Sequence, residues 1–336
     1  MELGTPLNAA ILGLGWWGRT VVGTMRGSGA MRLTAAFDPA PDAGVFAAEA
    51  GLRLAPSFDA VLADPGIGAV VLCTPHTLHA AQIVQAARAG KHVFCEKPLC
   101  LTRADAATAI AACREAGVVL GVGHERRFEP PILALRRMLE AGELGTPLQV
   151  EANFSQDKFL ALPADNWRLS QAEAPAGPMT ATGIHLLDLA ISLLGPAECV
   201  LALVRQLGSG LVNGDTLALM VQFRTGANAL ISAILATPFD GRFAVYGSNG
   251  WVEVRDKAHP EHSEGWTLTK SIRGEGRSVT EFPPAPAVRA NLEAFAAAAA
   301  GGPAYPVPPG QMLDTISAFE AVVRSSRSGG IEAVEG

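Results

Sequence analysis

The sequence has little charge and no excess of positive charge. Charged residues make up 17% of the 336 residues, and 32 acidic residues outnumber 26 lysines and arginines, which gives a net charge of −6. Nothing in this composition indicates the basic surface by which proteins bind nucleic acids or anionic membranes. We therefore expect neither partner.

Cysteine is scarce as well. The five cysteines are odd in number and form no C-x-x-C pair, which argues against a disulfide framework. Cys95 and Cys100 flank a loop, but nothing beside them completes a metal-ligand set, so we expect no metal. The first twelve residues lack the basic start and apolar core of a signal peptide. These features predict a cytoplasmic protein with reduced thiols.

Long apolar runs are missing too. The alanine tract at 296–300 is too short to span a membrane, and two glycines follow it. Hydrophobic residues nevertheless make up 49% of the chain, enough for sizeable cores. Because single cores stop growing near 250–300 residues, this length predicts two domains.

Glycine, by contrast, is placed with a clear spacing near the N-terminus. Gly13, Gly15 and Gly18 follow the pattern G-x-G-x-x-G, in which the glycines permit a tight turn, a close approach of pyrophosphate and close packing of helix on strand. Trp16 and Trp17 occupy two of the free positions. Since a cofactor contacts backbone there, the indoles either pack against the neighbouring loop or line the nicotinamide or substrate cleft.

The surroundings of this motif predict a dinucleotide-binding unit. An apolar run at 8–12 predicts a strand, apolar residues recur with helical spacing at 19–26, and a second predicted strand at 33–37 ends at Asp38. Asp38 follows Gly18 by 20 residues, where an acid accepts hydrogen bonds from the ribose. The next residues, 39–41, contain no arginine for a 2′-phosphate, so we expect NAD rather than NADP.

The alternation of predicted strands and helices continues to about residue 123 and then stops. We expect an α/β protein with a doubly wound parallel sheet in an N-terminal Rossmann domain at 1–123. Strands joined by short turns follow, which predicts an α+β domain at 124–336 with a large, mainly antiparallel open sheet for substrate binding and oligomerisation. The C-terminal helices could pack back on the first domain.

Two predicted strands of the second domain, at 216–223 and 229–235, flank a hairpin turn at Arg224-Thr225-Gly226. Their apolar residues occupy both alternating faces. One face can cover helices, but the other would expose a large apolar patch. We therefore expect a homodimer or homotetramer formed through this sheet.

Two polar segments follow predicted strands of the first domain, Cys73-Thr74-Pro75-His76 and Cys95-Glu96-Lys97-Pro98. The chain here resembles the Gfo/Idh/MocA family, named for glucose–fructose oxidoreductase and inositol dehydrogenase. The resemblance covers nearly the whole length. Its carriers are Gly13 to Gly18, Glu96-Lys97-Pro98, Asn166-Trp167-Arg168 and Gly183-Ile184-His185-Leu186-Leu187-Asp188.

This resemblance implies NAD(P)-dependent oxidation or reduction of sugars, cyclitols or related hydroxyl compounds. It also implies that Lys97 binds substrate and cofactor and transfers the proton, while His185 sits beside the reacting hydroxyl. Lysine and histidine suit proton transfer, which contributes roughly 10²–10⁴-fold to rate. Asp188, three positions beyond His185, could orient its ring or cap local structure. The peptide bond before Pro98 could be cis by the same resemblance.

The motif and the resemblance together predict two sets of site residues. The predicted substrate-binding residues are Lys97, Trp167, Arg168, Thr182, His185 and Asp188. The predicted cofactor-binding residues are Gly13, Gly15, Trp16, Trp17, Gly18, Asp38, Thr74, Pro75, His76, His79, Glu96 and Lys97. His79 is also expected to begin the next helix.

One position departs from the family pattern. Many members have an aspartate four residues before the histidine, where this chain has Ala181. Thr180 and Thr182 flank it, but neither replaces a charge. Three functions therefore stay open: an NAD-dependent enzyme of sugars or cyclic diols, an aromatic dihydrodiol dehydrogenase, and a catalytically silent NAD-binding protein. Substrate identity, reaction direction and the choice between dimer and tetramer also stay open.

Overall fold

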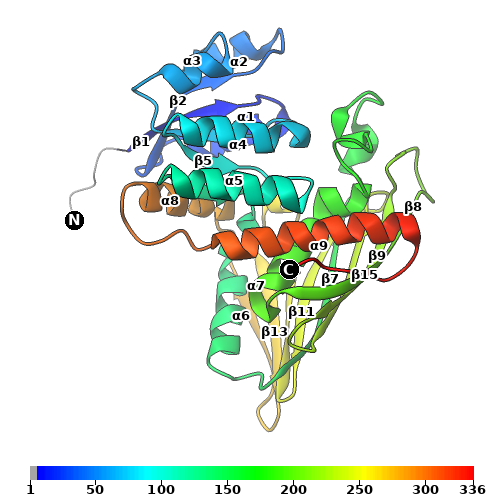
Figure 1. The fold of residues 1–336 in the computed structure, drawn as a ribbon. Coiled ribbons are helices and arrows are strands. Elements are labelled where there is room, and N and C mark those ends of the chain that lie inside the picture. The colour runs from blue at the N-terminus through cyan, green and yellow to red at the C-terminus, as the bar shows by residue number, and fades with distance from the viewer. Residues whose placement is uncertain (1–5) are drawn as a thin grey trace. The chain divides into compact units, whose positions relative to one another are not determined.

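The structure, a computed structural model, describes residues 6–336, which form two compact units. The first unit combines residues 6–125 with residues 286–313, and the second combines 126–285 with 314–336. In Figure 1 the first unit therefore contains the blue and cyan elements together with the orange helix α8 (Ala287–Ala299).

Within residues 6–125, six parallel strands form one sheet in the order β3-β2-β1-β4-β5-β6, and this confirms the predicted doubly wound topology. The strands are β1 (Leu7–Leu12), β2 (Met31–Phe37), β3 (Arg53–Leu54), β4 (Ala69–Leu72), β5 (His92–Cys95) and β6 (Leu120–Val122). The helices between them are α1 (Trp16–Met25), α2 (Ala43–Glu49), α3 (Phe58–Ala63), α4 (His79–Arg88) and α5 (Arg103–Glu115).

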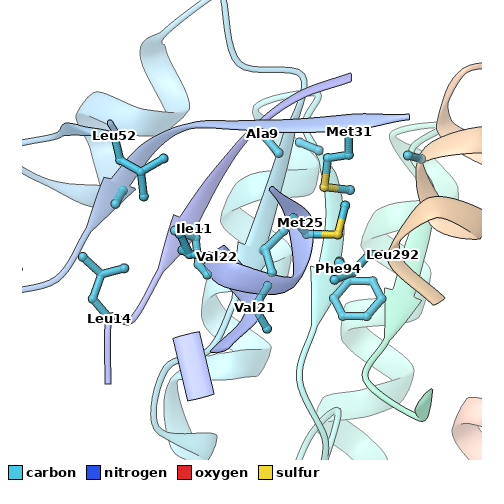
Figure 2. Packing of buried hydrophobic residues seen from close by; sticks show 14 of the residues in the cluster. Ala9, Ile11, Leu14, Val21, Val22, Met25, Met31, Leu52, Phe94 and Leu292 are labelled. Atoms are coloured by element: carbon cyan, nitrogen blue, oxygen red, sulfur yellow. The ribbon is translucent and has the colours of Figure 1, made fainter. Parts of the chain in front are cut away.

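The core of the first unit lies between its sheet and the helices α1 and α8. Ala9 and Ile11 of β1 pack against Val21 and Val22 of α1, and Phe94 of β5 lies in the same cluster, as Figure 2 shows. Leu292 and Phe295 add the apolar side of α8. Helix α4 covers β4 and β5 and packs beside α5.

The second unit is built on a nine-stranded sheet in the order β14-β13-β12-β11-β7-β10-β9-β8-β15. Among its described strand pairs only β7 and β10 run parallel, so the predicted, mainly antiparallel sheet is confirmed. The strands are β7 (Pro147–Ser155), β8 (Ala197–Arg205), β9 (Thr216–Phe223), β10 (Asn228–Ile234), β11 (Asp240–Gly247), β12 (Gly250–Asp256), β13 (Trp266–Ile272), β14 (Gly276–Phe282) and β15 (Glu332–Ala333). The helices of this part of the chain are α6 (Pro130–Glu140), α7 (Ile184–Leu194) and α9 (Pro309–Ser328), the last beginning in the first unit.

Local sequence signals located most of these elements. The hairpin at Gly226 forms as expected, with that glycine at a φ of 88°. Four strands were not predicted. Two of them, β3 and β15, are only two residues long. Of the other two, β14 is exposed over most of its length and shows no apolar alternation, and β8 shows little of it. Helix α1 begins at Trp16, earlier than the helical spacing indicated. Within the described part of the chain, no helix combines the length and apolar character needed to cross a bilayer.

Candidate active site

Four neighbouring strands of the first unit end in one row. The register places Leu12 opposite Phe37 on one side and Leu72 on the other, and Leu72 opposite Cys95. The residues that follow this row leave the sheet at its carboxyl edge, where open α/β sheets bind ligands. They are Asp38, Gly13, Cys73 and Glu96.

The glycine loop at this edge leaves room where a phosphate needs it. Gly13 has a φ of 91°, and a Cβ there would lie 2.5 Å from the Cys73 carbonyl oxygen. A Cβ at Gly18 would overlap the Gly13 carbonyl. At Gly15, the N-cap of α1, a Cβ would meet nothing within 4 Å in the described chain. The loop therefore fits a pyrophosphate, which would approach at Gly15 and face the positive end of α1.

The two tryptophans differ in environment. Trp17 is half-buried and packs against the core cluster shown in Figure 2, whereas Trp16 is 46% exposed. Their rings meet edge to face, with centroids 5.8 Å apart. Packing is therefore the main role of the Trp17 side chain, and Trp16 stays on the surface of the first unit.

Asp38 is held beside the glycine loop. Its carboxylate accepts hydrogen bonds from the Leu14 N–H at 2.5 Å and the Ala40 N–H at 2.8 Å. Arg19, which the sequence analysis missed, donates to the Leu14 carbonyl at 2.8 Å and to Asp42 at 2.5 Å. Residues 39–41 contain no arginine, and this guanidinium comes instead from α1.

The loop after β5 carries Glu96, Lys97 and Pro98, and the bond between Lys97 and Pro98 is cis. The Glu96 carboxylate accepts the Lys97 N–H at 3.2 Å and lies against Gly123, where a Cβ would overlap it. Lys97 is half-buried. Glu96 and Gly123 together fix the direction in which the lysine leaves the strand.

His79 begins α4, as predicted, and is fully buried. Its Nδ1 lies 2.8 Å from the Pro98 carbonyl oxygen and its Nε2 lies 3.0 Å from that of Thr74. The Thr74 hydroxyl donates to Gln82 at 2.6 Å. The buried ring therefore ties the loop after β4 to the loop that carries Lys97. His76, which directly follows Pro75, packs edge to face on His79 at 5.6 Å.

In the second unit, His185 is the second residue of α7 and is 6% exposed. A π-helical turn at Met179–Gly183 precedes α7, and such turns are frequent at functional sites. The Thr182 hydroxyl donates to the Phe154 carbonyl at 2.8 Å, and the Phe154 ring lies 6.0 Å from the His185 ring. Thr182 and Phe154 therefore set the position of this turn and of the histidine.

Asp188 is engaged by the protein itself. Its carboxylate receives two hydrogen bonds of 2.6 Å from Arg127 and one of 3.2 Å from Thr315. Of the two roles expected for Asp188, these contacts support the structural one.

Trp167 and Arg168 lie in a short 3-10 turn at Trp167–Leu169, capped by Asn166. The Arg168 guanidinium stacks on the Trp167 ring at 4.1 Å. The Asn213 side chain, which no sequence motif indicated, donates to the Arg168 carbonyl at 3.0 Å.

Ala181 belongs to the π-helical turn and packs against an apolar cluster of Leu169, Leu211 and Leu235. The position that holds aspartate in many family members is therefore half-buried and packs against leucine side chains in this chain.

His259 also contacts the Phe154 ring, although no sequence pattern pointed to it. Its ring is 5.8 Å from Phe154 and 5.5 Å from Phe239. Burial, followed by the positive charges of Lys158 and Arg126, lowers the pKa of His259 to about 3. The ring is therefore neutral at physiological pH and accepts at Nδ1 from Lys158 at 3.0 Å.

The cysteines are all free thiols. Burial raises the pKa of Cys95 and raises that of Cys100 and Cys113 to about 12, which keeps these three protonated and unreactive. Among the described residues, no cluster of His, Cys, Asp and Glu side chains is suited to bind a metal ion.

Known proteins match this chain along most of its length. Residues 7–124 match the oxidoreductase family with an NAD-binding Rossmann fold, and residues 132–253 match the GFO/IDH/MocA C-terminal domain. The 1,5-anhydro-D-fructose reductase of Ensifer adhaerens is 32% identical over 286 residues, which cover 84% of each chain. The D-xylose 1-dehydrogenase (NADP(+)) 2 of Haloferax volcanii is 29% identical over 276 residues, 81% of this chain and 82% of that one.

A solved structure has the same fold. The aldose-aldose oxidoreductase from Caulobacter crescentus, complexed with glycerol, superposes with a TM-score of 0.85 at 27% identity and covers 98% of this chain and 99% of that one. The family matches cover the first unit's sheet and much of the second unit's. The chain therefore belongs to the Gfo/Idh/MocA family and is an oxidoreductase with an NAD(P)-binding Rossmann fold.

Proposed function

We propose that this enzyme is an NAD-dependent dehydrogenase or reductase that acts on a hydroxyl-bearing carbon of a sugar, cyclitol or related diol. The order of strands in the first unit carries the proposal. Along one edge of the sheet it places Asp38 after β2, the glycine loop after β1, Thr74 after β4 and Lys97 after β5. An acid for the ribose and a basic group for the reaction thus lie on opposite sides of the loop that would hold the pyrophosphate.

Lys97 is the proposed proton-transfer group. Bound NAD supplies the hydride acceptor for oxidation, or the donor in its reduced form. In oxidation the Lys97 amine takes the hydroxyl proton, and in reduction its ammonium returns it, a contribution of roughly 10²–10⁴-fold. For His185 we propose a second donor role toward the substrate hydroxyl. His79, Glu96, Thr182 and Asp188, whose side chains bond to the protein itself, are proposed as positioning residues.

The relatives support a polyol substrate, since their names give a sugar reductase and a sugar dehydrogenase. Gln156, two residues after Phe154, is 6% exposed, and its buried Oε1 accepts no hydrogen bond within residues 6–336. A buried acceptor requires a donor, which a hydroxyl group would supply. The second candidate is an aromatic dihydrodiol, which the aromatic group of Phe154, Phe239 and His259 beside His185 favours.

The test is NADH formation with aldoses, cyclitols and an aromatic dihydrodiol as substrates. It is measured for the wild type, for Lys97→Ala and His185→Ala, and for Lys257→Ala, which is the control at an exposed lysine. We expect Lys97→Ala to lower turnover by about 10²-fold or more, Lys257→Ala to change nothing, and NAD binding by thermal shift to persist in all. His185→Ala should cost less than Lys97→Ala. A wild type that turns over a substrate while Lys97→Ala is equally fast would refute the role of Lys97.

A further inference from the structure

The second unit contains a pocket of about 190 Å³ that none of the residues assigned to the reaction lines. Its volume is roughly that of six water molecules, enough for a small organic acid or inorganic anion. The end of β8, the loop after it, the segment at 171–176 and the end of α9 form its walls. The lining residues that matter here are Ala176, Arg205, Val212, Asn213, Gly214 and Arg327.

The charge of this pocket is positive. Arg205 and Arg327 both line it, and its lining within the described chain includes no acid. Both arginines are exposed residues, and neither forms an ion pair with a carboxylate of residues 6–336. Arg205 donates one hydrogen bond, to the Val204 carbonyl at 2.8 Å. Guanidinium groups bind carboxylates and phosphates through paired, charge-assisted hydrogen bonds. The pocket therefore favours an oxyanion.

Asn213 indicates that the ligand of this pocket must also carry a hydrogen-bond donor. The residue is 2% exposed, and its Nδ2 donates to the Arg168 and Ala174 carbonyls, each at 3.0 Å. These two bonds fix which end of the amide is oxygen. The buried Oδ1 accepts no hydrogen bond from the described residues. Because such an acceptor is costly to bury unsatisfied, it calls for a donor on whatever occupies the pocket.

The loop behind the pocket is held in place. Asp215 accepts hydrogen bonds from the Leu207 and Gly208 amides and from the Ser209 hydroxyl. Burial by itself would raise the pKa of Asp215, but these bonds lower it, so the carboxylate stays charged. Ala176 has a φ of 51°, a conformation that is uncommon for residues other than glycine and occurs often where ligands bind.

We propose that this pocket binds a small oxyanion that also carries a hydroxyl group, such as a three-carbon hydroxy acid or hydrogen phosphate. Arg205 and Arg327 bind the oxyanion, and its hydroxyl donates to Asn213 Oδ1. Since Asn213 also holds the Arg168 carbonyl, occupancy restrains the segment that carries Trp167 and Arg168. An effect on substrate affinity rests on the proposed function, whereas the binding itself does not.

Calorimetric titration of the full chain without substrate tests the proposal. Two ligand pairs differ in a hydroxyl donor: lactate against propionate, and phosphate against sulfate. We expect the hydroxyl-bearing member to bind at least about tenfold more tightly. Lactate binding alone would identify a hydroxy acid as the ligand, and phosphate binding alone would identify phosphate. Equal binding within both pairs, or no binding by any ligand, would overturn the proposal.

Variants locate the site. Arg205→Gln and Arg327→Gln should each weaken binding at least about tenfold, while Arg277→Gln, an exposed arginine on β14, should have no effect. In hydrogen exchange, the bound ligand should slow amides 168–174 in the wild type but not in Arg327→Gln. Binding that survives both pocket substitutions would also overturn the proposal.

Discussion

Arg127 and Asp188 form a buried, two-pronged ion pair, with both nitrogen–oxygen distances at 2.6 Å. The two residues are 61 positions apart in the chain and lie within the second unit. Asp188 is on α7, one turn after His185, so the pair fixes the helix that presents the histidine.

Removing one partner of this pair should be strongly destabilising, because it leaves a buried charge without compensation. We expect Arg127→Met to reduce the free energy of unfolding by about 3–5 kcal/mol. Arg127→Met combined with Asp188→Leu should recover much of this loss, since no charge is then left buried. Urea unfolding of the single and double variants measures both effects. A double variant as unstable as the sum of its singles would contradict this reading.

Ala181 is the position where restoring the family aspartate should fail. Its neighbours Leu169, Leu211 and Leu235 are apolar and buried, so an ionised carboxylate at this half-buried position would lose part of its hydration without gaining a partner from that cluster. Ala181→Asp should therefore lower the melting temperature more than the uncharged, similarly sized Ala181→Asn. It should also give no gain in NADH formation with polyols. Higher turnover at unchanged stability would show that the aspartate can be restored.

Much of this fold follows from local patterns in the sequence. Apolar strands that end at Gly13, Cys73 and Cys95 locate the cofactor edge, because parallel strands place their carboxyl ends together. The Arg127–Asp188 pair and the Asn213 contact to Arg168 join distant parts of the chain, and periodicity carries no information about such contacts. The same limit applies to α8, which packs in the first unit although its sequence follows the second unit's strands.

Cofactor preference should depend on Asp38 and on the pairing of Arg19 with Asp42. Asp38 would accept hydrogen bonds from the ribose hydroxyls and repel a 2′-phosphate. Arg19 could bind that phosphate if its ion pair with Asp42 were broken. We expect Asp38→Ala to weaken NAD binding about tenfold and Asp42→Ala to tighten NADP binding. Titration of both cofactors with the wild type and both variants, at one ionic strength, measures this. NADP binding by the wild type that equals or exceeds NAD binding would refute the proposed preference.

His259 should make stability fall in acid. Its pKa is lowered from 6.5 to about 3 in the folded state, so between these values the unfolded chain binds a proton that the folded chain does not. The contribution of the neutral ring to the free energy of unfolding is complete above pH 6.5 and is lost as the pH falls toward 3. The melting temperature of His259→Gln should therefore fall less than that of the wild type when the pH is lowered from about 7.5 to 5. Burial also lowers the pKa of His92, so some pH dependence should remain in the variant. If the melting temperatures of the wild type and His259→Gln depended on pH in the same way, His259 would be excluded as a source of the acid destabilisation.

The outer face of the large sheet predicts self-association. Leu201 of β8, Met220 of β9 and Leu230 of β10 stand opposite one another across three neighbouring strands, and Met220 and Leu230 are 44% and 46% exposed. A continuous apolar row of this kind usually marks a contact surface, and a second copy would cover it with the same row. We expect light scattering at micromolar concentration to give a multiple of the 34.8 kDa chain mass. Met220→Glu should shift this mass toward the monomer, because it places a charge in the contact, whereas Val279→Glu, at an exposed position on β14, should not. A wild type that scatters as a monomer would contradict the proposed oligomer.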